Sequence, residues 1–142
     1  MVAERDLSRL LAALDPHLHV ERYSFIATSE PDLADADFAI VREAEGLTLI
    51  RSEAAGEWAR ISLGVHSSLG AVGLTAVLSE RLADAGISAN IVAALHHDHI
   101  FVPWTAGPKR WRRCAVSRLV ETSLRGPTGR GNPDWIASLG SQ

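Results

Sequence analysis

The run of residues 60–103 most constrains what this chain can fold into, because its apolar pattern changes period along the run. Residues 60–66 alternate between apolar and small or polar side chains, which is typical of a half-buried strand. Residues 71–85 place apolar side chains three or four positions apart and predict a helix, with Gly86 where a helix C-terminus favours glycine. Two more apolar segments follow. This order predicts a βαββ unit, most of a split βαβ domain.

The two segments after the helix are expected to pair as a hairpin. The second of them covers residues 99–102 and the first covers residues 87–95. Alternation in the first strand places five residues inward: Ile87, Ala89, Ile91, Ala93 and Leu95. Because several of these are small, we expect a helix to pack closely on that face.

The N-terminal part of the chain predicts one helix and three strands. Asp6 is a suitable N-cap for a helix that Asp15-Pro16 ends. Strands are predicted at residues 22–27, 38–42 and 47–50, the last two joined by the turn Glu43-Ala44-Glu45-Gly46. A short turn with glycine between apolar runs is typical of a β-hairpin.

Length and composition bound the class of protein. A chain of 142 residues with 46% hydrophobic residues is one ordinary domain, or two very small ones sharing a core. No stretch reaches the ~20 apolar residues of a membrane helix, and the first residues do not resemble a secretory signal, so we expect no membrane partner. The single cysteine, Cys114, suits a reducing compartment and predicts a cytoplasmic protein.

The last part of the chain differs from the rest in charge. Residues 104–142 contain 7 basic and 2 acidic residues, a net charge of +5, whereas residues 1–103 carry −8. They also contain three of the four tryptophans, and Gly107-Pro108 interrupts any helical period. The chain therefore changes character at Pro103, where a βαββαβ plan would require a second helix and a last strand.

Residues 38–103 resemble a family of small bacterial ACT-domain proteins of undefined function, in which two ACT-like lobes occupy one short chain. The resemblance is dense and covers nearly half of the sequence. It is carried by Phe38, Arg42 to Leu49, Val65 to Leu69, Ala71 to Thr75, Gly86 to Asn90 and His97 to Pro103.

The resemblance implies an α+β fold of ferredoxin-like βαββαβ ACT domains, with one lobe over residues 1–57 and a second over residues 58–103. The second lobe is expected to be incomplete, with apolar sheet surface left open. ACT domains are regulatory modules that commonly bind amino acids between paired domains. We therefore expect a non-enzymatic module without a cofactor, whose small-molecule ligand is an amino acid. Exposed sheet edges favour a homodimer.

The tail departs from the family, whose members continue after the Val-Pro with a short acidic turn and a helix rich in Ala and Leu. A frame shifted by one base restores that pattern, since Trp104 must come from TGG and a preceding G gives Val. The shifted frame can then read Asp, Arg and an amphipathic helix. The sequence predicts that residues 104–142 are an irregular basic tail produced by out-of-frame translation.

The predicted ligand site is the loop after the first strand of residues 60–103. Its small residues open a helix N-terminus, whose backbone N–H groups lack partners and can hold a carboxylate. The resemblance implies that this loop faces the strand around Asn90. The predicted ligand-binding residues are His66, Ser67, Ser68, Leu69, Gly70, Ala71, Val72, Gly73, Leu74 and Asn90. The plainer interpretations are a serine N-cap and an Asn90 side chain bonded to nearby backbone.

Four other residues are weaker candidates for ligand contact. Glu43 and Glu45 have the charge to bind the ammonium or guanidinium group of an amino acid, although a solvated hairpin turn is the favoured interpretation. His97 and His99 belong to the segment His96-His97-Asp98-His99, which predicts a structural turn or a ligand contact.

Two functions of other classes stay open at the level of sequence. One is a small metal-dependent enzyme using His66, His97 and His99, because imidazole and carboxylate ligands suit zinc or iron. The other is a nucleic-acid-binding protein that uses the basic tail, where Arg110, Trp111, Arg112 and Arg113 form a cationic, aromatic patch. The out-of-frame tail explains the same residues without nucleic acid.

Overall fold

The computed structural model describes residues 3–30 and 37–104, and that part forms two helices and one six-stranded sheet. The strands are antiparallel in the order β2-β3-β1-β4-β6-β5. This confirms the predicted α+β, ferredoxin-like class. The elements are α1 (Leu7–Ala12), β1 (Pro16–Thr28), β2 (Asp37–Glu43), β3 (Gly46–Ser52), β4 (Trp58–Leu63), α2 (Leu74–Asp84), β5 (Asn90–Ala93) and β6 (Asp98–Pro103).

Local sequence signals place most of these elements. The Asp6 carboxylate caps α1 by accepting a hydrogen bond from the Arg9 N–H at 3.0 Å. Gly46 closes the β2–β3 turn with a φ of +145°, and Gly86 follows the end of α2 with a φ of +68°. Both values lie where glycine is favoured. The predicted order of strand, helix, strand, strand over residues 60–103 is confirmed.

The start of α2 differs from the prediction. The helix begins at Leu74, because Ala71 lies in a turn in which its N–H donates to the Ser68 carbonyl at 2.8 Å. Gly73 takes the N-cap position with a φ of +94°, and no side chain caps the helix. The plainer interpretation of this loop, in which a serine caps α2, is therefore wrong.

The strand after α2 is shorter than predicted. The Ile87 N–H still donates to the Leu82 carbonyl, and the Ala94 N–H already closes the next turn onto the His97 carbonyl. Only Asn90–Ala93 is therefore free to form β5. Ala93 and Leu95 do not point inward as predicted: Ala93 is exposed, and 67% of the Leu95 surface is open to solvent.

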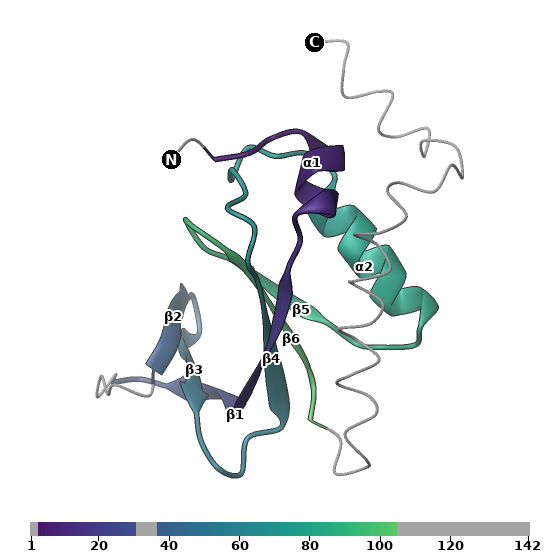
Figure 1. Cartoon of the computed structure of the whole chain (residues 1–142). Helices are drawn as coiled ribbons and strands as arrows, with labels where there is room; N and C mark the ends of the chain where they lie inside the picture. The colour runs from purple at the N-terminus through teal and green to yellow at the C-terminus, as the bar shows by residue number, and fades with distance from the viewer. Residues whose placement is uncertain (1–2, 31–36, 105–142) are drawn as a thin grey trace.

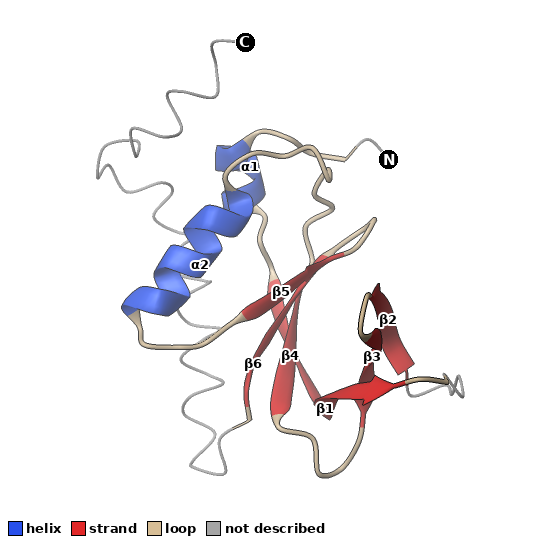
Figure 2. Cartoon of the chain, turned by 180° about the vertical axis from the view of Figure 1, so that it is seen from behind, coloured by secondary structure: helices blue, strands red, loops and turns tan. Residues whose placement is uncertain are grey.

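Both helices cover the same face of the sheet, as Figures 1 and 2 show from opposite sides. The core under them joins apolar residues of both helices to one face of β4 and β6. Its fully buried members are Leu10, Leu11, Leu14, Ala59, Ile61, Leu63, Leu82 and Ile100, with Leu78 and Val102 at 1% and 2% exposure. Alternation on β4 and the i, i+4 spacing on α2 place these side chains, as the sequence predicts.

The segment α1–β1 adds a helix and a strand beside the unit that begins at β4. β4 and β5 run parallel with β6 between them and α2 as the connection, which is a split βαβ arrangement. β1 runs parallel to β6 with β4 between them, and α1 packs into the same core as α2. Residues 7–28 thus place a helix and a strand where a βαββ unit alone would leave its sheet open.

The same two strands also belong to the N-terminal unit. β1 and β2 run parallel with β3 between them, and β4 lies on the other side of β1. The two halves therefore share β1 and β4. The division at residue 57 and the incompleteness of the second lobe remain predictions. The predicted out-of-frame tail lies, apart from Trp104, outside the described residues.

The sheet curls strongly on the side away from the helices. Three strands separate β2 from β6, so a flat sheet would place them roughly 19 Å apart. The Phe38 ring on β2 nevertheless lies 5.4 Å from the Phe101 ring on β6 and 4.8 Å from the His99 ring. The β2–β3 hairpin therefore folds over the second face, as its position in Figure 1 shows.

The link between β3 and β4 generates a test of this packing. Gly56 is buried, and a Cβ there would lie 2.6 Å from the backbone N, C and O atoms of Tyr23. We expect Gly56→Ala to lower the free energy of unfolding by about 3 kcal/mol, because backbone cannot yield as a side chain can. Urea denaturation measures this.

Gly70→Ala is the matched control. Its Cβ would meet only ordinary contacts, the nearest being Ser68 Oγ at 3.7 Å. We expect a change within about 0.5 kcal/mol. Equal urea midpoints for the two variants would contradict the close packing of Gly56 against the backbone of Tyr23.

Candidate ligand-binding site

The loop after β4 is held by the chain segment that precedes α1. The Glu4 N–H donates to the His66 carbonyl at 3.1 Å, and the Ser68 N–H donates to the Glu4 carbonyl at 2.9 Å. These bonds form an isolated parallel bridge between Glu4 and Ser67. The N-terminal segment and the loop, 63 residues apart in sequence, are thereby fixed to each other.

Ser67 is part of the structure that holds the loop. It is 5% exposed, and its hydroxyl donates to the Asp98 carboxylate at 2.9 Å. Asp98 opens β6 and is itself buried. Because this hydroxyl is committed to Asp98, Ser67 contributes position rather than a free donor to any ligand.

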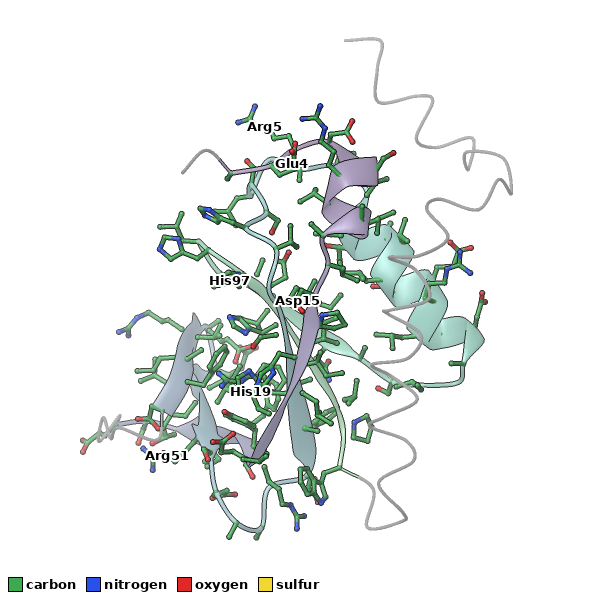
Figure 3. The ribbon with its side chains drawn as sticks, viewed as in Figure 1. Glu4, Arg5, Asp15, His19, Arg51 and His97 are labelled. Carbon is green, nitrogen blue, oxygen red and sulfur yellow. The ribbon has the colours of Figure 1, made fainter. Side chains whose placement is uncertain are left out.

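Ser68 organises the exposed turn that follows. Its Oγ accepts hydrogen bonds from the Gly70 N–H at 3.2 Å and from Arg5 Nε at 3.3 Å. The Arg5 guanidinium therefore lies against the turn, and Figure 3 shows Glu4 and Arg5 together ahead of α1. This arrangement places a cation beside the backbone that leads into α2.

Apolar residues flank this turn on its solvent side. Leu69 and Val72 are 66% and 65% exposed, whereas Leu74 is buried in the core. Gly73 packs against α1, because a Cβ there would lie 3.0 Å from Leu7 Cδ2. The loop and the N-terminal segment beside it thus bring together a cation, backbone groups and apolar surface.

Imidazole rings line the other edge of the loop. The Nδ1 of His96 lies 3.4 Å from the Nε2 of His66, and His97 Nδ1 bonds to the Val65 carbonyl at 3.2 Å. His97 is near the β5–β6 turn in Figure 3. His99 instead bonds to Ser62, so His66, His97 and His99 do not converge as a metal site would require. Within residues 3–30 and 37–104, no group of three potential ligands is arranged to hold a metal ion.

Asn90 lies away from the loop. It begins β5 and pairs with Phe101, whereas Ala93 pairs with Asp98, the partner of Ser67. Three residues of strand therefore separate Asn90 from the level of Ser67, about 10 Å. The structure does not bring Asn90 to the loop within one chain.

Glu43 and Glu45 belong to the β2–β3 turn and not to the loop after β4. They line a pocket of about 310 Å³ together with residues from the end of β1 and the start of β3. Glu43 also accepts a hydrogen bond from Thr48 Oγ1. Their role as ligand contacts remains a prediction.

A polar cluster that the sequence did not predict lies on the curled face of the sheet. We call it the Arg60 cluster, and it consists of His19, Arg60, Ser62 and His99. Alternation on β4 does place Arg60 and Ser62 on one side of the sheet. No local sequence pattern predicts that His19 lies beside them. It lies in the segment of β1 where the register with β4 shifts.

Burial sets the protonation of this cluster. Loss of solvent around His99, and next the Arg60 charge, lower its pKa from 6.5 to about 4. The same two causes, in the same order, lower the pKa of His19. Both rings are therefore neutral at physiological pH.

We expect Ser67→Ala to lower the free energy of unfolding by about 1.5–3 kcal/mol, because it leaves the buried Asp98 carboxylate without that donor. Ser68→Ala, in the exposed turn, serves as the control and should change it by less than about 1 kcal/mol. Thermal and urea unfolding of both variants provide the comparison. A Ser67→Ala protein as stable as the wild type would show that the bond does not fix the loop.

Stability should also depend on pH through His99. The unfolded chain takes up a proton near pH 6.5 and the folded chain only near pH 4, so stability is complete above 6.5 and falls as pH drops between these values. We expect a loss on the order of 2 kcal/mol, less than the shift alone implies, because solvent screens a half-buried ring. His99→Gln should flatten this dependence and His96→Gln should retain it; identical pH profiles for His99→Gln and wild type would refute the assignment.

Comparison with known proteins places this fold in a family. A model described as an ACT domain matches residues 2–64, and a second ACT-domain model matches residues 53–106. The two ranges overlap on residues 53–64, which contain β4, one of the two strands that both halves share. The comparison with curated proteins finds no match.

Two solved structures are similar to this chain. A Vibrio cholerae protein of unknown function, described as a possible transport protein, is 35% identical, with a TM-score of 0.65. The match covers 82% of this chain and 95% of that one. An Agobacterium tumefaciens protein shares the fold at 16% identity and a TM-score of 0.56, over 78% of this chain and 89% of its own. The chain therefore belongs to the ACT-domain proteins and carries two ACT-type domains in one short polypeptide.

Proposed function

We propose that this chain is a non-enzymatic regulatory module that binds a free amino acid at the loop of residues 66–74. ACT domains are regulatory modules that bind small molecules, which supports the class of function. The observation that carries the position of the site is the Arg5 guanidinium against Ser68 Oγ, next to the uncapped N-terminus of α2. A cation and backbone donors side by side suit an α-carboxylate.

The remaining features of the loop fit the rest of such a ligand. Leu69 and Val72 supply exposed apolar surface for a side chain, and His66 and His96 supply polar atoms at the edge. In this proposal Ser67 holds the loop through Asp98 and does not touch the ligand.

Two finer proposals follow from the sheet. β2 and β5 are the outer strands, each paired on one side only within the described sheet, which supports a homodimer formed at an edge. Asn90 lies on β5 and is exposed, so in our proposal it contacts ligand only when such a dimer brings it to the partner's loop.

The single cysteine supports a cytoplasmic setting. None of the described helices has the length and apolar character of a membrane span.

A thermal-shift screen of the standard amino acids tests the proposal. A ligand at about 100 times its Kd stabilises the fold by about 2.7 kcal/mol, which raises Tm by roughly 5–10 °C for a chain of this size. Arg5→Gln should lose that response because it removes the cation. Arg42→Gln, which neutralises an exposed arginine on β2, is the matched control and should keep it.

Two results would count against this function. One is a flat screen, in which no amino acid raises Tm at millimolar concentration. The other is an Arg5→Gln protein that responds as fully as the wild type, which would move the site away from the loop.

A further inference from the structure

The Arg60 cluster lies on the face of the sheet that the helices leave uncovered. Arg60 and Ser62 come from β4, His19 from β1 and His99 from β6. All four residues keep part of their surface exposed to solvent. Figure 3 shows His19 on β1, on the side where the β2–β3 hairpin lies.

Hydrogen bonds connect these residues in one direction. A guanidinium has only donors, so Arg60 Nη2 donates to His19 Nδ1 at 3.0 Å. His19 Nε2 must then carry the proton and donates to Ser62 Oγ at 2.8 Å. The Ser62 hydroxyl in turn donates to His99 Nδ1 at 2.8 Å. This order leaves the Nε2–H of His99 as the donor at the end of the chain.

Aromatic rings hold the Arg60 guanidinium. Its Cζ lies 5.0 Å from the centre of the Tyr23 ring and 4.7 Å from that of Phe38. These stacks stabilise the cation and occupy its faces, which directs its N–H groups toward in-plane acceptors. Phe38 also packs edge-on against His99, so an apolar wall borders the cluster.

The positive charge has no acidic partner. Among residues 3–30 and 37–104, no carboxylate forms an ion pair with Arg60. Arg60 Nε is also the one buried side-chain N or O atom of the described part without a hydrogen-bond partner. A buried donor left unpaired is costly, and an oxygen acceptor that reaches it recovers that cost.

We propose that the Arg60 cluster is a second binding site, separate from the loop, that takes a small carboxylate or phosphate anion. The anion accepts from the free N–H groups of Arg60 and from the Nε2–H of His99. Phe38 and Tyr23 exclude water from part of the site and strengthen these charge-assisted bonds.

Binding should change the titration of both imidazoles. Besides Arg60, the charges of His19, His97 and Asp98 act on the pKa of His99. Those of His17 and Glu21 act on the pKa of His19. A bound anion offsets the Arg60 charge and favours the imidazolium form, so the pKa of both rings should rise and affinity should increase as pH falls.

NMR of the histidine ring protons in the full-length protein tests this site. Inorganic phosphate and acetate are titrated separately, at an ionic strength held constant with sodium chloride. We expect saturable shifts of the His99 and His19 signals with at least one anion, which identifies the preferred chemistry. Arg60→Gln should weaken binding at least about 10-fold. Arg42→Gln and Arg5→Gln should not, which separates this site from the loop.

The wild-type titration decides the proposal even if Arg60→Gln folds poorly. Shifts of His99 that do not saturate with either anion would overturn it, as would equal responses to sodium chloride alone. Arg60→Lys keeps the charge but loses the planar group that stacks on Tyr23 and Phe38, and we expect it to bind the anion more weakly than the wild type. A folded Arg60→Gln protein that binds the anion as tightly as the wild type would also overturn the proposal. So would an Arg42→Gln protein that loses anion affinity as strongly as Arg60→Gln does.

Discussion

The antiparallel pairing of β1 with β4 is the constraint on which the rest of this structure depends. β1 pairs with β3 along its C-terminal half, Tyr23 to Thr28, and with β4 along its N-terminal part, Pro16 to Tyr23, with a register shift near His19. It therefore needs to be long, and its 13 residues are the most of any described strand. Through this pairing, α1 reaches the core beside α2, and each half of the chain closes with a strand that the other half also uses.

Both candidate sites follow from that shared pairing. On the helix side, the segment before α1 lies beside the loop after β4, which fixes Arg5 against Ser68. On the other side, the irregular segment of β1 directs His19 toward Arg60 and Ser62, and the curled hairpin adds Phe38. A single sheet thus presents one candidate site on each side, and both sites depend on the pairing of β1 with β4.

The sequence predicts features that depend on the local spacing of apolar residues. It does not predict contacts between residues that are far apart in the chain. The βαββ order, the Asp6 cap and the buried face of α2 are local, so the sequence around each of them predicts it. The partners of Ser67 and Arg60 lie 31 and 41 residues away, at Asp98 and His19. No spacing rule joins such pairs, and the register shift in β1 leaves no mark in its apolar pattern. The position of Asn90 relative to the loop also depends on distant pairing, because Asn90 pairs with Phe101 and not with Asp98.

Native-state amide hydrogen exchange tests the shared-strand account most directly. It compares the opening free energies of β3 amides, which bond to β1, with those of β6 amides, which bond to β4. If the two halves share β1 and β4, both groups should open together in the global unfolding event, with free energies equal within about 1 kcal/mol. Exchange of β3 from a state in which β6 stays protected would contradict the account, because it would show that the halves fold as separate units.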